Sequence, residues 1–434
     1  MLISVTLGSD LLSPDALREF AIGIILSTLE PSVENVRFAG NDGIIYEEKH
    51  TRILRLSLAN METETLLDKD LIWEWAYGKY VENCNSGYVL TRTCSLFKVL
   101  ATHRQYVASH DLRYFAIFTP TPDSLEIHRR FNVTFTSSIV NREELNRLLR
   151  RNITSIPEKM SKKLINRVGI TKTDSEEQKF IQWNPTGDDY IFWQDGHLYY
   201  SESVNSAKSV RISDGRPNWD HGSTGALWSV KGQKLAFLSH DKTKQKSIYM
   251  TSYSKKEKYP IVVELEYPKT HEKQPQAIVV NIWDKKTRSL KQMDVQLRNR
   301  NAFHNLVGVK WIVMKGEEVF VATWANRLYT HIFLTICDHR AGICKPVFEY
   351  EYPSKMWTHE TDFASLLATD DAIYILLPRA ASDGNSYQHI AKLTIQMDSP
   401  ENLKGLEWAK SSFLSVGNFD VTKLEAYDET TDIM

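Results

Sequence analysis

The dominant pattern along the chain is an apolar strand, a polar turn and a second apolar strand, repeated many times. The segments FIQWNPTGDDYIFW, from Phe180, and ALWSVKGQKLAFL, from Ala226, show it most clearly. Apolar stretches of this length, separated by polar turns that contain glycine, are typical of antiparallel β-hairpins. Segments of the same form begin near residues 33, 105, 308, 363 and 421.

A further strand with a different pattern of apolar and polar residues follows most of these hairpins. Examples are RILRLSL at Arg52, HLYYSE at His197 and HIFLTIC at His331. The resulting units recur at intervals of roughly 45 to 80 residues, which is typical of propeller blades with insertions of variable length. The pattern therefore predicts an all-β fold, a β-propeller with six blades and the beginning of a seventh.

One region, residues 139–169, breaks the pattern. It contains Asn141 as a helix cap, Glu143 and Glu144 in a first helical turn, and many basic residues after them. We expect a short helical insertion near 139–169, within a less regular region at 135–170. Nucleic-acid binding is disfavoured because no aromatic residues lie among the basic ones and the formal net charge of the chain is −1.

Composition agrees with a large globular β-protein. The 434 residues include 11 Trp, 19 Tyr and 17 Phe, and large flat side chains are common in β-sheet cores. The most apolar stretch, Phe20 to Leu29, is too short to cross a bilayer and has no basic region before it. We therefore expect no transmembrane segment in this chain.

The spacing of the four cysteines suggests disulfides. Cys337 and Cys344 flank a polar turn between two predicted strands, where facing residues lie close enough for a bridge. Closing that loop would add roughly 2.5 kcal/mol to stability on a chain-entropy estimate. Cys84 and Cys94 flank a second hairpin-like segment and are a weaker candidate pair. The alternative is four buried thiols in a cytosolic protein.

Two glycosylation acceptor triplets agree with an oxidising compartment. They begin at Asn132 and Asn152, each followed two residues later by threonine. Together with the cysteine spacing they favour the secretory pathway, and hence an extracellular or cell-surface location.

Motifs for common catalytic and cofactor sites are missing from the sequence. It contains no H-E-x-x-H, no C-x-x-C, no P-loop and no G-x-G-x-x-G. The 13 histidines are scattered, and His103, His197, His331 and His389 lie near predicted strand ends, where surface histidines are common. We predict no catalytic residue, no metal and no cofactor.

Distinctive segments of the chain include QWNPTGDDYIFWQDGHLYY, ALWSVKGQKLAFLSHD and YPIVVELEYPKTHEKQPQAIVVNIWD. They resemble the N-terminal propeller of the dipeptidyl peptidase IV family, within the prolyl oligopeptidase clan. The likeness covers residues 175–434, is looser over 30–130 and is absent over 135–170. It is closest to the non-catalytic neuronal branch, which modulates voltage-gated potassium channels.

This resemblance implies an eight-bladed propeller followed by an α/β-hydrolase domain that carries a Ser-Asp-His triad. We expect residues 1–32 to be an N-terminal flank and 33–434 an incomplete propeller of six to seven blades, with no hydrolase domain. The final segment, LEAYDETTDIM, then lies inside a blade. The family also implies membrane anchoring and a dimer.

The nearest match to the G-x-S-x-G nucleophile motif is Gly384-Asn385-Ser386-Tyr387-Gln388. Its last glycine is replaced, and the residues after it alternate like a strand, so we expect a polar hairpin loop. In the family, serine-type removal of N-terminal dipeptides at a penultimate Pro or Ala depends on this motif. We therefore expect this chain alone to be inactive.

The family propeller also contributes paired glutamates that hold the free amino terminus of the substrate. The corresponding segment here, RISDGRPNWDHGSTGALWS, contains Asp214 and Asp220 but no adjacent carboxylates. Glu47 and Glu48 are adjacent, but we expect a solvated pair at a strand end. The likeness around Arg129 and Arg130 is too loose to assign the substrate-positioning arginine of the family to either residue.

Three functions remain open. One is the propeller portion of a peptidase-family protein. Another is a non-catalytic, dipeptidyl-peptidase-like auxiliary subunit. The third is an unrelated propeller scaffold. The expected partners are peptide ligands or a membrane channel, and no nucleic acid.

Overall fold

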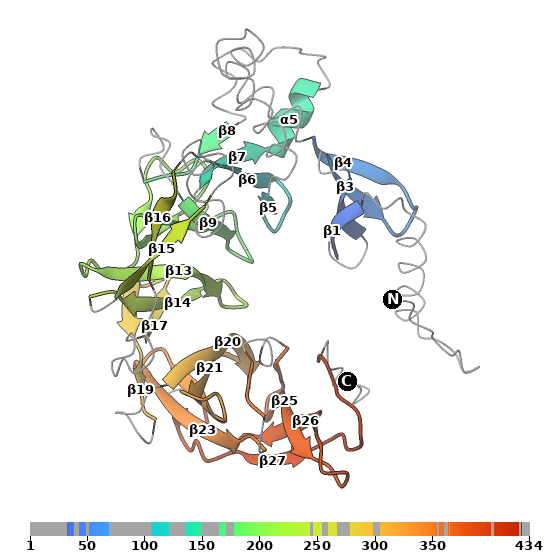
Figure 1. Cartoon of the computed structure of the whole chain (residues 1–434). Coiled ribbons are helices and arrows are strands. Elements are labelled where there is room, and N and C mark those ends of the chain that lie inside the picture. The colour runs from blue at the N-terminus through green and yellow to red at the C-terminus, as the bar shows by residue number, and fades with distance from the viewer. Residues whose placement is uncertain are drawn as a thin grey trace. The chain divides into compact units, whose positions relative to one another are not determined.

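The structure is a computed structural model of the chain (Figure 1), and it divides into two compact units, residues 1–168 and 169–434. The residues described are 33–38, 43–48, 52–68, 106–120, 135–149, 165–170, 178–243, 246–253, 259–266, 278–297, 304–353, 356–359, 363, 365–400, 403–424 and 427.

The first unit contains two sets of four neighbouring antiparallel strands, which we call blades 1 and 2. The strands of blade 1 follow one another in chain order, and in blade 2 the helix α5 (Arg142–Leu149) lies between the last two strands. Blade 1 consists of β1 (Val33–Phe38), β2 (Gly43–Glu48), β3 (Arg52–Ser57) and β4 (Thr63–Asp68). Blade 2 consists of β5 (Tyr106–Ala108), β6 (Tyr114–Pro120), β7 (Phe135–Asn141) and β8 (Ile165–Arg167).

The second unit contains blades 3 to 6, which follow one another along the chain (Figure 1). Blade 3 consists of β9 (Gln178–Trp183), β10 (Tyr190–Gln194), β11 (His197–Ser201) and β12 (Val210–Arg211), and blade 4 of β13 (Trp219–Trp228), β14 (Lys234–Asp241), β17 (Ile278–Asp284) and β18 (Ser289–Gln292). Blade 5 consists of β20 (His304–Met314), β21 (Glu317–Asn326), β22 (His331–Asp338) and β23 (Ile343–Glu351), and blade 6 of β24 (Leu367–Ala368), β25 (Ala372–Ala380), β26 (Ser386–Thr394) and β27 (Lys410–Phe413). The predicted all-β fold of repeated antiparallel sheets is confirmed.

The cores of the second unit lie between consecutive blades. Strand β14 shows how: Leu235 and Phe237 pack in the cluster between blades 3 and 4, whereas Ala236 packs in the cluster between blades 4 and 5. Aromatic side chains fill the first of these clusters, where the ring centroids of Tyr200 and Trp283 lie 4.9 Å apart. Each sheet is thus buried on both faces, which explains the nearly continuous apolar runs in its middle strands.

Two of the described hairpin turns share one local design. The backbone N–H of Ser229 donates to the carbonyl of Lys234 (2.8 Å), and the Ser229 hydroxyl accepts from the backbone N–H of Lys234 (3.1 Å). Ser109 and Tyr114 form the same pair of hydrogen bonds in blade 2. A serine at this position satisfies backbone groups that the end of the strand would otherwise leave unpaired.

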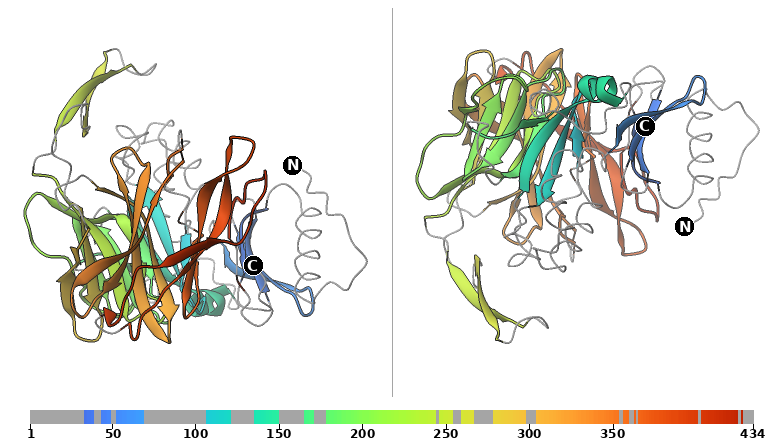
Figure 2. Two further views of the ribbon diagram at one scale, coloured as in Figure 1. Left: turned by 90° about the horizontal axis from the view of Figure 1, so that it is seen from below. Right: turned by 90° about the horizontal axis from the view of Figure 1, so that it is seen from above.

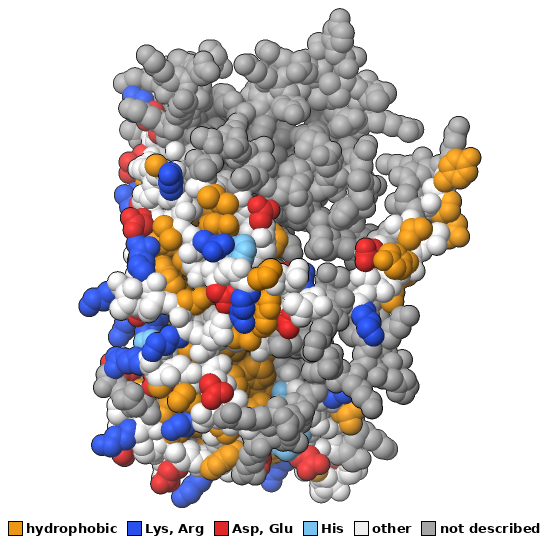
Figure 3. Space-filling view, turned by 90° about the vertical axis from the view of Figure 1, so that its left-hand side faces the viewer, with side chains coloured by type: hydrophobic (Ala, Val, Ile, Leu, Met, Phe, Trp, Pro, Cys, Tyr) orange, Lys and Arg blue, Asp and Glu red, His pale blue; other side chains and the backbone are white. Residues whose placement is uncertain are grey.

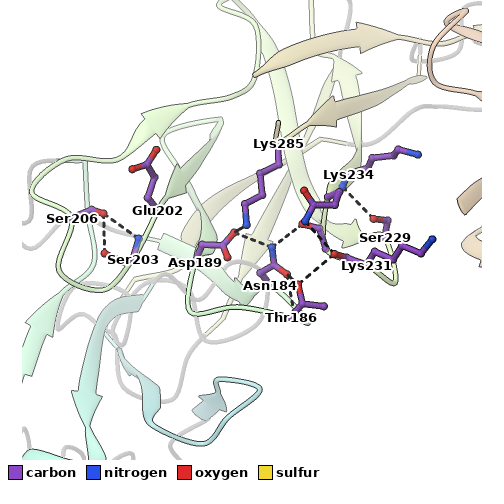
Figure 4. Close-up of polar contacts among 12 residues, drawn as sticks. Asn184, Thr186, Asp189, Glu202, Ser203, Ser206, Ser229, Lys231, Lys234 and Lys285 are labelled. Carbon is purple, nitrogen blue, oxygen red and sulfur yellow. Dashed lines mark hydrogen bonds and ion pairs between the residues drawn. The ribbon is translucent and has the colours of Figure 1, made fainter. Parts of the chain in front are cut away.

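Hydrogen bonds also connect the turn of one blade to the turn of the next. The buried side chain of Asn184, in blade 3, donates to the carbonyl of Gly232 in blade 4 (2.8 Å) and to Asp189 (2.9 Å) (Figure 4). Asp189 in turn pairs with Lys285 of blade 4, and the atoms of that ion pair lie 2.8 Å apart. Asn184 therefore fixes the spacing of the two blades at this end.

The same kind of connection continues along the unit. The backbone N–H of Lys231 donates to Glu318 of blade 5 (2.5 Å), and the backbone N–H of Lys315 donates to Asp370 of blade 6 (2.5 Å). In each case a carboxylate oxygen of one blade accepts a hydrogen bond from a backbone N–H in the turn of the preceding blade. Consecutive blades are therefore aligned by polar groups as well as by their apolar cores.

The predicted helix is present as α5 (Arg142–Leu149). The side chain of Asn141 accepts from the backbone N–H of Glu144 (3.2 Å), as expected of a helix cap. Strands β7 and β8, however, pair with each other on either side of the helix, inside the range assigned to the insertion. The helical insertion therefore starts at residue 142, and both strands belong to blade 2.

One hairpin of the second unit forms a sheet of its own. It consists of β15 (Ser247–Ser252) and β16 (Ile261–Glu266), which pair only with each other among the described strands. Both views in Figure 2 show it standing apart from the blades. We call it the β15–β16 hairpin. Two residues, Asp294 and Val295, form β19, which pairs in parallel with β23 at the edge of blade 5.

The chain after β27 packs back on blade 6. The backbone N–H of Val421 donates to the carbonyl of Gln388, the buried side chain of Leu424 joins the cluster around Tyr374, and Tyr427 contacts the ring of Tyr374. Most of the predicted seventh hairpin lies outside the described residues. Within the described part of the chain, no helix has the length and apolar character needed to cross a bilayer.

The role of Asn184 can be tested at the glycine it contacts. A Cβ at Gly232 would lie 2.0 Å from Asn184 Oδ1, and the φ of Gly232 is +65°. We expect Gly232→Ala to lower the free energy of unfolding by about 3 kcal/mol, of which about 1 comes from the left-handed backbone and about 2 from the disrupted buried contact. Chemical denaturation measures this loss.

The matched control is Gly384→Ala. The φ of Gly384 is +83°, but nothing lies within 4 Å of a Cβ there, so only the backbone cost of about 1 kcal/mol is expected. Equal losses in the two variants would contradict the role given to Asn184.

Candidate functional site

The segment in which the family resemblance implies substrate-binding carboxylates runs from the end of β12 through β13. Strand β13 begins at Trp219 and pairs regularly with β14 as far as His221, where its register shifts until Ala226. Gly222 lies at the start of this bulge with φ +77°, and a Cβ there would lie 2.5 Å from the side chain of Leu198. Bulges of this kind redirect side chains, and here the bulge follows a group of polar residues.

His221 is the centre of that group. Its side chain is 1% exposed, its Nδ1 lies 2.6 Å from Ser239 Oγ, and its Nε2 lies 3.1 Å from Asp214 Oδ1. Its backbone N–H donates to the carbonyl of Gly196 in blade 3 (3.0 Å). We call the surrounding set the His221 network: His197, Ser213, Asp214, Arg216, Trp219, Asp220, His221, Ser239 and Asn281.

A second imidazole stacks on the first. The ring centroids of His197 and His221 lie 5.4 Å apart with 17° between the planes, and His197 Nδ1 lies 3.0 Å from Ser213 Oγ. Trp219 stacks against His221 at 6.3 Å, and the Arg216 guanidinium lies 3.8 Å from the centroid of the Trp219 ring. The network is therefore a layered arrangement of flat side chains between blades 3 and 4.

The two carboxylates of the segment are already paired. Asp214 Oδ2 lies 2.8 Å from the Arg216 guanidinium, and the Gln292 side chain donates to the same oxygen (3.0 Å). Asp220 accepts from the indole N–H of Trp193 (3.3 Å) and lies 3.5 Å from Lys242 Nζ. Each carboxylate therefore has a cation of its own and is not set beside the other as a pair that would hold an ammonium group.

Burial controls the titration of this network. It lowers the pKa of His197 and of His221 below the ordinary imidazole range, although the negative charge of Asp214 opposes this. Burial tends to raise the pKa of Asp214, but hydrogen bonds from Arg216 and the nearby His221 outweigh it, and the pKa is lowered. Neutral imidazoles beside an ionised Asp214 are therefore the favoured state near neutral pH.

Asp214, His221 and Ser239 have the residue types of a hydrolytic triad, but not its accessibility. Ser239 is 0% exposed, within β14, and its hydroxyl also accepts from the side chain of Asn281 (2.8 Å). A nucleophile must reach the carbonyl carbon of its substrate, which a serine inside a sheet cannot do. The geometry supports a structural role for these three residues.

Other residues singled out from the sequence lie elsewhere. The structure joins Cys337 and Cys344 in a disulfide that links β22 to β23, with the Cα atoms 3.9 Å apart and both side chains buried. Ser386 begins β26, after the polar hairpin loop that was expected there. Outside the described residues lie Cys84, Cys94, Arg129, Arg130, Asn132 and Asn152.

Two expectations about exposure were wrong. Glu47 is 2% exposed because β2 lies inside blade 1, between β1 and β3, whereas Glu48 at the strand end pairs with Arg52 at 2.6 Å. His389, expected at the surface, is 1% exposed and lies 3.1 Å from both Ser415 Oγ and the carbonyl of Gly417. Among the described residues, no group of three or more His, Cys, Asp or Glu side chains is placed to hold a metal ion.

Comparison with known proteins places the chain among peptidase relatives. Residues 151–434 match the family described as the dipeptidyl peptidase IV (DPP IV) N-terminal region. The chain is 33% identical over 341 residues to dipeptidyl peptidase family member 1 of Caenorhabditis elegans, covering 74% of this chain and 41% of that protein. It is 23% identical over 270 residues to the inactive dipeptidyl peptidase 10 of Rattus norvegicus, covering 58% of this chain and 32% of that protein.

A solved structure shows the same fold. The dipeptidyl peptidase 4 of Porphyromonas gingivalis aligns with a TM-score of 0.62 at 16% identity, covering 95% of this chain and 50% of that one. The chain thus spans less than half the length of these two curated relatives and half of the solved protein.

The structural role of Ser239 predicts a clear loss of stability. Ser239→Ala would remove the partner of both His221 Nδ1 and the Asn281 amide in a buried site. We expect the free energy of unfolding to fall by about 2 kcal/mol in a denaturant titration. Ser411→Ala, at an exposed serine of β27, should change it by less than about 0.5 kcal/mol. A Ser239→Ala chain as stable as the parent would show that the network is dispensable.

Proposed function

The chain belongs to the dipeptidyl peptidase IV N-terminal region family, and we propose that it acts as a binding and gating module without catalytic activity of its own. In full-length peptidases of this family, the propeller accompanies a domain that removes N-terminal dipeptides. The residues described here supply the propeller part of that arrangement.

The main support is the state of Asp214 and Asp220. Anchoring the amino terminus of a peptide requires carboxylates that are free to accept from an ammonium group, and each of these is paired with an internal cation, Arg216 or Lys242. Ser239, which contacts His221, is buried in β14. These contacts favour a surface that binds partners over one that processes peptides.

A second candidate is a non-catalytic auxiliary subunit of a voltage-gated potassium channel. Its support is the likeness to an inactive dipeptidyl peptidase, together with the neutralised carboxylates of the His221 network. Co-purification of the epitope-tagged chain with a co-expressed channel favours this candidate, and recovery of peptide ligands without a channel favours the first. The disulfide between Cys337 and Cys344 supports an extracellular or cell-surface location for either.

The β15–β16 hairpin supports self-association, as expected from the dimeric family. Exposed aromatic side chains lie on its strands and between them: Tyr249 in β15 is 70% exposed, and Tyr253 and Tyr259, in the connection from β15 to β16, are each 82% exposed. Figure 3 shows hydrophobic side chains along this projecting hairpin. Tyrosines presented in this way on a separate hairpin are typical of contact surfaces between proteins, so we propose a second copy of the chain as the partner.

The absence of catalysis can be tested directly. Purified chain should release no chromophore from a Gly-Pro or Ala-Pro chromogenic dipeptide, because Ser239, the serine that contacts His221 beside Asp214, is buried within β14. The control is a full-length active peptidase of the family in the same assay. Turnover by the chain that is abolished by a serine-directed phosphonate would contradict the proposal.

Self-association can be tested on the hairpin. In light scattering after size-exclusion chromatography, the parent chain should contain dimer, and the double variant Tyr253→Ser, Tyr259→Ser should be shifted to monomer because it loses exposed aromatic contact area. Trp357→Ser is the control, since Trp357 is 65% exposed but lies outside the hairpin. A dimer that survives the double variant, or is lost equally in the control, would exclude the hairpin as the contact.

A further inference from the structure

The Nδ1 atoms of the two stacked imidazoles of the His221 network face serine hydroxyls, which suit the neutral form of each ring. His221 Nδ1 faces Ser239 Oγ at 2.6 Å, and His197 Nδ1 faces Ser213 Oγ at 3.0 Å. The two rings are nearly parallel, with centroids 5.4 Å apart. A proton on both rings would place two like charges face to face at that distance in a buried site, which is unfavourable.

Charged groups approach the pair from every element packed around it. The carboxylates Asp214 and Asp220 favour a protonated imidazole, but each already has a cation beside it. The positive charge of Arg216 acts on His221, and that of Arg211 acts on His197. The full set is Asp195 on the β10–β11 turn, Arg211 on β12, Asp214 and Arg216 on the following loop, Asp220 on β13, and His240 and Lys242 at the end of β14.

His221 lies where its contacts hold the start of β13 in place. It is the last residue of β13 to pair in register before the bulge, and its backbone N–H donates to Gly196 in blade 3. Beyond it lie Gly222 and Gly225, with φ of +77° and +117°. Ser239 and Asp214, on two other segments, contact its side chain. Asp220 also holds the start of β13, through Trp193 and Lys242, and His221 adds the contacts that lie next to the bulge.

We propose that His197 and His221 form an acid-sensitive latch that holds the start of β13 to β11 and β14 at neutral pH. Acidification adds a proton to one of the rings, separates the stack and breaks the contact between His221 and Ser239. Residues 214–225 then open while the apolar cores between the blades remain intact. The latch lies at the junction of blades 3 and 4 and acts whichever partner the chain binds.

The direction of the pH dependence follows from the burial. Since burial lowers the pKa of both histidines, the opened segment binds protons more readily than the closed one. The latch therefore contributes its full stability above the ordinary imidazole pKa of about 6.5. The contribution is lost as the pH falls from there towards the lowered pKa of the closed state. Histidine is suited to this role because it titrates in the mildly acidic range.

Amide hydrogen exchange of the whole chain tests the latch. The backbone amides of His221 and Leu198 report on it, because they donate to Gly196 and to Ser213 Oγ. We expect their protection factors, corrected for intrinsic exchange, to fall on the order of tenfold between about pH 7.5 and pH 5.5. The amides of β21, in blade 5, should keep theirs. Unchanged protection at His221 would overturn the proposal.

Two variants isolate the histidines. His221→Asn and His197→Gln keep polar groups in the site but take up no proton, so the double variant should lose the tenfold drop. The matched control is His389→Asn, because His389 is also 1% exposed and also lies beside a serine hydroxyl, in blade 6. It should keep the drop at His221. A drop that persists in the double variant, or disappears in the control, would overturn the assignment.

A second measurement covers the case in which the double variant does not fold. Deuterium exchange at the imidazole C2 position, followed across pH in the parent chain, gives the titration midpoint of each histidine. Midpoints for His197 and His221 below that of an unstructured histidine support the latch. Midpoints at or above it would overturn the proposal, because protonation would then stabilise the closed state.

Discussion

The burial of each sheet on both faces is the constraint on which the second unit depends. In β14, neighbouring residues Leu235 and Ala236 belong to different cores, one shared with blade 3 and the other with blade 5. A blade of this kind cannot bury its apolar surface alone, so its stability depends on its neighbours. Spacing between blades then becomes critical, and Asn184, Glu318 and Asp370 fix it through hydrogen bonds to neighbouring turns.

This constraint also explains which parts of the fold could be predicted from the sequence. The two strands and the turn of a hairpin are close together in the sequence, so hairpins can be predicted from short segments such as Ser229 to Lys234. The Cys337–Cys344 disulfide and the Asn141 cap are local for the same reason. The resemblance added the family, which strand patterns alone could not give, since many unrelated propellers share them.

The His221 network was not predictable because its members come from separate segments that meet only in the folded chain. Spacing along the chain gives no signal that His197, His221 and Ser239 will touch, and His197 was expected at the surface as a strand-end histidine. Glu47 was misjudged for a related reason: its burial depends on the strands either side of β2. Whether a polar residue is exposed depends on the residues that pack against it in the folded chain, and these are often far away in the sequence.

The distribution of polar groups bears on where function resides. Within blades 3 and 4, the charges that could have formed a ligand site are paired with one another, because a buried charge without a partner is costly. Asp214 with Arg216 and Asp220 with Lys242 therefore support the fold and leave little free capacity for a ligand. The β15–β16 hairpin lies outside this constraint, since it shares no sheet with the blades and has no core of its own to bury Tyr253 or Tyr259. A hairpin of two strands is only marginally stable in water, so its exposed tyrosines gain most from contact with another protein.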